Sequence, residues 1–101
     1  MHVNAELSLI PIGSGISLSP YIAACQQVLE EAGLEVELHA NGTNLAGDWE
    51  AVMDAVRRCH EVVHGMGAVR ITSTLKLSTR TDREQGLAET LERVRSRLGD
   101  G

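Results

Sequence analysis

Apolar and polar residues alternate in four short stretches of the chain, which predicts four β-strands. These stretches are residues 3–10, 34–40, 43–46 and 69–77. Asn41-Gly42 separates the second stretch from the third, and this dipeptide favours a tight hairpin turn with Ala40 opposite Thr43. The first and fourth stretches are apolar on one side and polar on the other. We therefore expect a sheet with one buried face and one polar face.

Three further stretches have apolar residues at helical spacing. Residues typical of helix starts and ends bound each of them. These are Ser19-Pro20 and Gly33 for the first helix, Gly47-Asp48 and Gly65 or Gly67 for the second, and a Thr81–Glu84 capping box and Gly99 for the third.

The predicted order is βαββαβ followed by one more helix, which is the order of a ferredoxin-like sandwich. We predict a single α+β domain over residues 1–101, with an antiparallel four-stranded sheet and an extra C-terminal helix. Two helices would cover one face of the sheet, and we expect a second copy of the chain to cover the other. The predicted open face carries Asn4, Glu6, Ser8, Arg70, Thr72, Thr74 and Lys76.

Composition narrows the classes of partner. The chain has a formal charge of -5, with one Trp, one Tyr and no Phe, so we expect neither a phosphate-binding surface nor stacking platforms for nucleic acid. No apolar stretch approaches the roughly 20 residues that span a bilayer, and no export signal is visible. Cys25 and Cys59 lie in predicted helices outside any C-x-x-C pair. We expect a cytoplasmic protein with reduced, buried thiols and no membrane partner.

Residues 60–64, His-Glu-Val-Val-His, match the H-E-x-x-H signature of zinc metalloproteases. Two histidines at i and i+4 can bind zinc, but hydrolysis needs a third protein ligand. The extended signature requires His at a position where this chain has Arg70. We expect no bound metal, and a zinc-dependent hydrolase using His60, Glu61 and His64 is an alternative hypothesis. In the structural interpretation, one histidine packs at the helix edge and the other caps its C-terminus.

Glu6 is an informative polar residue because a carboxylate in the middle of a covered strand is costly without a partner. The first and fourth strands are neighbours in the predicted fold, so Arg70, Thr74 or Lys76 could be that partner. The equal alternative is a ligand site, since a carboxylate and hydroxyls can read the donors and acceptors of an aminopyrimidine. On this hypothesis the ligand is bound by the Glu6 carboxylate and by the hydroxyl groups of Thr43, Thr72 and Thr74.

Short motifs follow one another in a specific order over nearly the whole chain. They are Glu6-Leu7-Ser8-Leu9-Ile10-Pro11-Ile12-Gly13, Ser19-Pro20-Tyr21, Gly42-Thr43, Gly47-Asp48, His60-Glu61, Gly67-Ala68-Val69-Arg70, Thr74-Leu75-Lys76-Leu77 and Arg80-Thr81-Asp82. In order and spacing they resemble the thiamine-binding protein family. The chain departs from that pattern on either side of Gly42, with His39-Ala40-Asn41 and Leu45-Ala46-Gly47 in place of Thr-Pro-Met and Ile-Glu-Gly.

The resemblance implies a ferredoxin-like subunit that forms dimers or tetramers, with a pocket at a subunit interface for thiamine or its hydroxymethylpyrimidine part. It implies no catalytic activity and no cofactor. A third hypothesis is an oligomerisation or regulatory module without a ligand, since this fold serves many roles. The candidate ligand-binding residues are Glu6, Ser8, Tyr21, Thr43, Asn44, Thr72 and Thr74.

Overall fold

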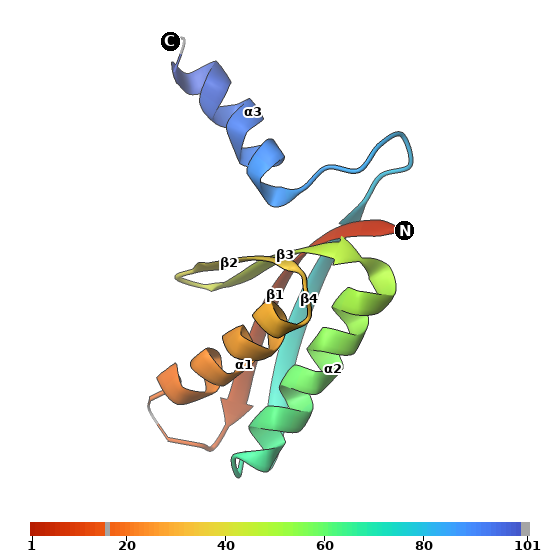
Figure 1. Ribbon diagram of the computed structural model, residues 1–101. Coiled ribbons are helices and arrows are strands. Elements are labelled where there is room, and N and C mark those ends of the chain that lie inside the picture. Colours follow the sequence, from red (N-terminus) through yellow and green to blue (C-terminus); the bar gives the residue numbers. More distant parts are fainter. Residues whose placement is uncertain (16, 100–101) are drawn as a thin grey trace.

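Four antiparallel strands form one sheet in the order β2-β3-β1-β4, as Figure 1 shows for this computed structural model, which describes residues 1–15 and 17–99. The elements are β1 (His2–Ile12), α1 (Ser19–Glu31), β2 (Glu35–His39), β3 (Gly42–Asp48), α2 (Trp49–Gly65), β4 (Arg70–Thr79) and α3 (Leu87–Gly99). The predicted ferredoxin-like α+β fold with an extra C-terminal helix is confirmed. No described helix has both the length and the apolar character needed to cross a membrane.

The hydrophobic core lies between the sheet and the layer formed by α1 and α2 (Figure 1). The side chains that point from β1 and β3 into this layer are aliphatic except for the buried Thr43, and no Phe is available to fill it. Burying them supplies most of the driving force for folding. The largest fully buried side chains are Leu29, Leu45, Val3, Val52, Val63 and Cys59.

The two neighbours of β1 cover different lengths of it. β4 pairs with β1 from Val3 to Ile12. β3 pairs with it only from His2 to Leu7, because β3 begins at Gly42. Beyond Leu7, the edge of β1 on the β3 side has no strand partner within the described sheet. Alternate backbone N–H and C=O groups of a strand point to each edge, so this segment leaves some of them unpaired by the sheet.

The pairing predicted for the β2–β3 hairpin is wrong by two residues. His39 pairs with Gly42, so the loop is Ala40-Asn41 rather than Asn41-Gly42. No non-glycine residue in the described chain has a positive φ, and neither does Gly42, so the turn that Asn-Gly favours does not form. A Cβ on Gly42 would lie 2.8 Å from the Leu7 carbonyl oxygen, so its lack of a side chain allows close approach to β1. The shift is even, and every residue keeps its predicted face.

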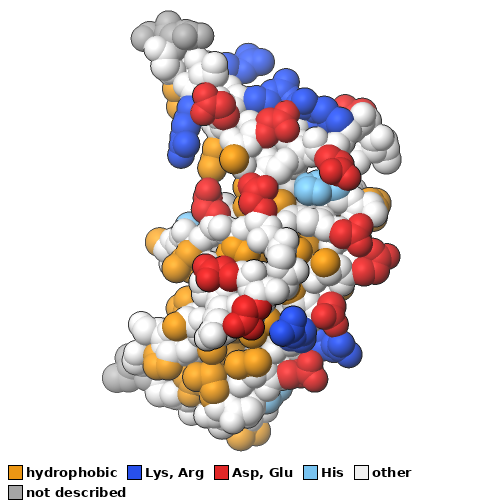
Figure 2. Space-filling view, viewed as in Figure 1, with side chains coloured by type: hydrophobic (Ala, Val, Ile, Leu, Met, Phe, Trp, Pro, Cys, Tyr) orange, Lys and Arg blue, Asp and Glu red, His pale blue; other side chains and the backbone are white. Residues whose placement is uncertain are grey.

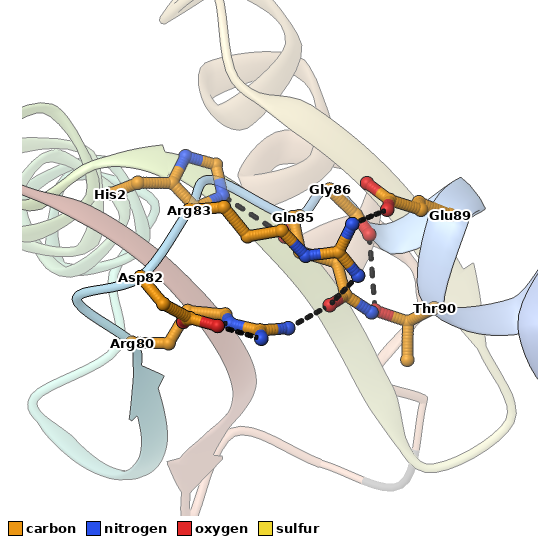
Figure 3. A network of polar contacts seen from close by, with 8 residues as sticks. All are labelled: His2, Arg80, Asp82, Arg83, Gln85, Gly86, Glu89 and Thr90. Carbon is orange, nitrogen blue, oxygen red and sulfur yellow. Dashed lines mark hydrogen bonds and ion pairs between the residues drawn. The ribbon is translucent and has the colours of Figure 1, made fainter.

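The helix α3 lies outside the two-helix layer and projects away from the sheet (Figure 1). It begins at Leu87, so the capping box predicted at Thr81 and Glu84 is wrong. Residues 80–86 form a connection held by polar side chains, drawn in Figure 3. Arg80 binds the carboxylate of Asp82 through two hydrogen bonds and also donates to the side-chain oxygen of Gln85. These interactions hold the chain in a loop where a helical turn was expected.

Candidate ligand-binding site

A pocket of about 400 Å³ lies at the unpaired edge of β1. Its walls come from β1, one side of α1 with the residue before it, and the tip of the β2–β3 hairpin. Figure 2 shows hydrophobic side chains gathered over α1, at the lower left of the view. The pocket is a consequence of the short hairpin, since a longer β3 would fill it. Its main apolar walls are Leu7, Leu9, Leu18, Ile22, Leu29 and Leu38, and its polar lining is Ser8, His39, Asn41 and Thr43.

His39 joins this pocket to the open face of the sheet. Its Nδ1 accepts a hydrogen bond of 3.2 Å from the backbone N–H of Asn41, which places the ring proton of the neutral form on Nε2. Nε2 lies 3.3 Å from Oε2 of Glu6, within ion-pair distance. The contact does not have hydrogen-bond geometry, and Nε2 is buried without a hydrogen-bond partner. A buried donor left in this state favours any ligand that can satisfy it.

A second cleft, of about 330 Å³, lies on the open face beneath the start of α3. Its floor includes a row of residues from all four strands, in which Glu37, Asn44, Glu6 and Lys76 lie opposite one another in turn. Asn44 donates to Oε1 of Glu37 across 3.3 Å. Leu87, Thr90 and Leu91 of α3 form its other wall. Within this cleft, Asn44 and Glu37 already pair with each other, and Glu6 contacts His39 outside it.

The structure divides the candidate site residues between several surroundings. Ser8 and Thr43 line the pocket, and Thr43 is buried on the face that the helices cover. Glu6 and Asn44 line the second cleft. The exposed Thr72 and Thr74 lie on β4 opposite Ile10 and Ser8, outside both cavities, and Tyr21 packs against the core. Of the structural partners proposed for Glu6, Lys76 lies opposite it on β4. The Glu6 carboxylate instead makes its close contact with His39.

The two histidines of the H-E-x-x-H match have structural contacts. His60 Nε2 and Ser73 Oγ form a hydrogen bond of 2.7 Å. His64 Nδ1 donates to the carbonyl oxygen of Ala68, also at 2.7 Å, just beyond the last turn of α2. In residues 1–15 and 17–99, no three His, Cys, Asp or Glu side chains form a group that could hold a metal ion. His64 therefore ties α2 to the chain that follows it, and does not cap a carbonyl of the helix as the structural interpretation expected.

His39, Asn41, Cys25 and Leu38 line the pocket but were not among the predicted site residues. Their contribution depends on where the hairpin ends, which is a long-range property. One signal was present in the sequence. The first predicted strand is longer than the third, and in this fold the two are neighbours, so part of the longer strand must lack a partner.

The fold and this pocket define a small ferredoxin-like α+β protein with room for a small molecule. Residues 5–95 match the sequence pattern of a family described as "thiamine-binding protein". The chain belongs to this family. A UPF0045 protein of Synechocystis sp. is 50% identical over 98 residues, covering 97% of this chain and 81% of that protein. A UPF0045 protein of Methanothermobacter thermautotrophicus is 37% identical over 98 residues, covering 95% and 99%.

Solved structures share the fold. The crystal structure of a hypothetical protein from Methanocaldococcus jannaschii superposes with a TM-score of 0.85 at 34% identity, covering 92% of this chain and 95% of that one. A Thermotoga maritima protein, described as a candidate for thiamine biosynthesis or salvage, has a TM-score of 0.80 at 17% identity, covering 93% and 99%. At that identity the likeness shows the fold alone. Membership of the family supports a binding role.

Proposed function

We propose that this protein binds thiamine, or a related molecule with its hydroxymethylpyrimidine ring, in the pocket at the unpaired edge of β1, without catalysing a reaction on it. The observation that carries the proposal is the combination of apolar walls with a buried His39 Nε2 that has no hydrogen-bond partner. The volume of about 400 Å³ lies at the lower end of the roughly 300–1,000 Å³ typical of small-molecule sites. Family membership supports the ligand class.

The pocket chemistry suits a flat heteroaromatic ring. Leucine and isoleucine side chains remove the ring faces from water, while Ser8 and Thr43 hydroxyls and the unpaired backbone groups of β1 can meet ring nitrogens and an amino group. The chain carries a formal charge of -5, which favours a cationic ligand such as one with a thiazolium ring. Binding at this site needs no metal or cofactor.

In this proposal Glu6 acts through His39. Its carboxylate lies 3.3 Å from Nε2 and favours the tautomer with a proton on that nitrogen. Glu6 is therefore a positioning residue. Glu6→Gln keeps the shape of the side chain but removes the charge, and is expected to weaken thiamine binding in calorimetry without lowering the unfolding temperature. An unchanged affinity would remove Glu6 from the site.

A matched pair of threonine variants tests the location of the site. Thr43→Val removes one hydroxyl from the pocket, and Thr74→Val makes the same change on the exposed face of β4. By calorimetry with thiamine and with hydroxymethylpyrimidine, Thr43→Val should weaken binding about 2- to 10-fold, the value of one hydrogen bond. Thr74→Val should bind like the wild type. Equal effects of the two variants would contradict this location, and no binding of either compound by the wild type would overturn the proposed function.

We also infer that two copies of the chain associate through the open face of the sheet. That face exposes Ile10 by 46% and Ile12 by 43%, and the end of α3 exposes Val94 by 54% and Leu98 by 73%. Apolar surface of this kind is typical of an interface. Because Ile10 also lines the pocket, a second copy would come close to the bound ligand. Light scattering should give a multiple of the monomer mass, and Ile12→Glu should lower it; a wild-type monomer would refute the inference.

A further inference from the structure

Two free cysteines meet where α1 packs against α2, directly behind the pocket. Cys59 Sγ lies 3.7 Å from the carbonyl oxygen of Cys25. The neighbouring Cys59 thiol lowers the pKa of Cys25 against the opposing effect of burial, whereas the Cys25 thiol and burial both raise the pKa of Cys59. The two thiols are therefore unequal, and Cys25 forms the thiolate more readily.

The pocket reaches only one of the two thiols. Cys25 lines it and is 8% exposed, whereas Cys59 is 0% exposed and does not line it. Cys25 follows Ile22 by one turn of α1, and both side chains face the pocket. A small reagent that enters the pocket therefore meets Cys25 first, with Cys59 behind it.

We propose that Cys25 is a redox modification site reached through the pocket, and that Cys59 is the thiol that resolves it into a Cys25–Cys59 disulfide. The oxidant is a small hydroperoxide. The Cys25 thiolate attacks one peroxide oxygen, an S–O bond forms as the O–O bond breaks, and the peroxide is reduced to hydroxide or alkoxide. Cys59 then attacks the sulfenic sulfur, the S–S bond replaces the S–O bond, and the Cys59 proton leaves with the oxygen as water.

The disulfide would tie α1 to α2 at the inner wall of the pocket. Leu29, one turn further along α1, is 1% exposed and lines the same wall, so a change in the spacing of the two helices changes the pocket. A ligand in the pocket would in turn block the path to Cys25. This inference rests on the pocket and the two thiols, and not on thiamine being the ligand.

Peptide mass spectrometry tests the chemistry. The first Arg or Lys in the chain is Arg57, so trypsin leaves Cys25 in residues 1–57 and Cys59 in residues 59–70. Wild-type protein treated with hydrogen peroxide should give these two peptides linked, with two hydrogen atoms lost, and dithiothreitol should separate them. Cys59→Ser should instead accumulate a Cys25 sulfenic acid that dimedone traps, and Cys25→Ser should give neither product. Absence of the linked peptides in the wild type would overturn the proposal.

The route of access is tested by narrowing the pocket. Ile22→Trp adds bulk at a pocket residue that is 41% exposed, and Met66→Trp makes the corresponding change at a residue that is 43% exposed and outside the pocket. The Ile22 variant should slow alkylation of Cys25 by iodoacetamide at least tenfold, and the Met66 variant should not. Equal rates in both would show access by unfolding and refute the route. If the disulfide forms but thiamine does not bind, the proposed function fails and this inference stands. If thiamine binds but the disulfide does not form, this inference fails and the proposed function stands.

Discussion

The carboxylate of Glu35, on β2, accepts a hydrogen bond of 3.0 Å from the backbone N–H of Ala88 in the first turn of α3, 53 positions away in sequence. The first N–H groups of a helix have no partner within the helix, and an acceptor with negative charge suits this end of the helix dipole. Glu35 therefore holds the start of α3 against the sheet. His2 holds the segment just before α3, since its Nε2 donates to the carbonyl oxygen of Gln85 (Figure 3).

Replacing Glu35 should release α3 without unfolding the rest of the domain. Glu35→Ala removes the cap of Ala88, which costs about 0.5–2 kcal/mol at a helix N-terminus. Hydrogen exchange in residues 87–99 should accelerate, while exchange in α1 and α2 stays at the wild-type rate. Glu37→Ala is the control, because that carboxylate lies on the same strand but accepts from Asn44. Equal acceleration in both variants would show that charge alone, and not the cap, holds the helix.

Gly86 tests the same contact from the other side. A Cβ at this position would lie 2.6 Å from Oε2 of Glu35, so Gly86→Ala must displace the carboxylate that caps Ala88. We expect Gly86→Ala to accelerate exchange in α3 to about the same extent as Glu35→Ala. The double variant should add little, since both changes remove one interaction. Fully additive effects in this cycle would show that Gly86 acts on another contact.

The sequence predicted the sheet better than the helix that follows it. Alternation along β1 placed Val3 and Leu7 inside and Glu6 outside, and the structure agrees, because such a pattern has only one face to bury. The start of α3 was mispredicted, because a local capping-box pattern competed with interactions that no local pattern contains. These are the binding of Asp82 by Arg80 and the cap supplied by Glu35.

The candidate site was predictable only in part for the same reason. Ser8 and Thr43 were identified by their chemistry and do line the pocket, whereas His39 and Cys25 were not identified. The position of His39 depends on the hairpin pairing, which Gly42 sets by its close approach to Leu7. Cys25 was correctly predicted to be buried, but its proximity to Cys59 depends on how α1 and α2 pack against each other. Contacts between distant segments decide both.

Acid should loosen the connection to α3 only at low pH. Arg80 lowers the pKa of Asp82 to about 2, from an unfolded value of about 3.9. The interaction therefore stabilises the folded loop fully above about pH 4, and this contribution is lost as the pH falls through about 2. In a carboxyl NMR titration, Asp82 should titrate near pH 2 and Arg80→Gln should move it towards 3.9. Arg57→Gln is the control, because Arg57 pairs with Asp54 on α2 at 2.6 Å, away from this connection. A midpoint near 4 for Asp82 in the wild type would contradict this prediction.

Two glycine-to-alanine changes should have opposite effects on stability, because one site is crowded and the other is open. At Gly42 a Cβ would lie 2.8 Å from the Leu7 carbonyl oxygen, which belongs to the backbone of β1, so β1 and β3 would have to move apart. Overpacking of this kind costs about 1–3 kcal/mol, so Gly42→Ala should lower the free energy of unfolding measured in urea. It should also weaken ligand binding, since Gly42 lines the pocket.

Gly65, the last residue of α2, has no atom within 4 Å of the same hypothetical Cβ and has no positive φ. Alanine there restricts the unfolded chain and favours the helix, so Gly65→Ala should raise the free energy of unfolding by about 0.4–1 kcal/mol and leave binding unchanged. If Gly42→Ala were equally harmless, β3 would not need its close contact with β1. The short hairpin would then not be held where it leaves the edge of β1 open, and the pocket would lose its structural basis.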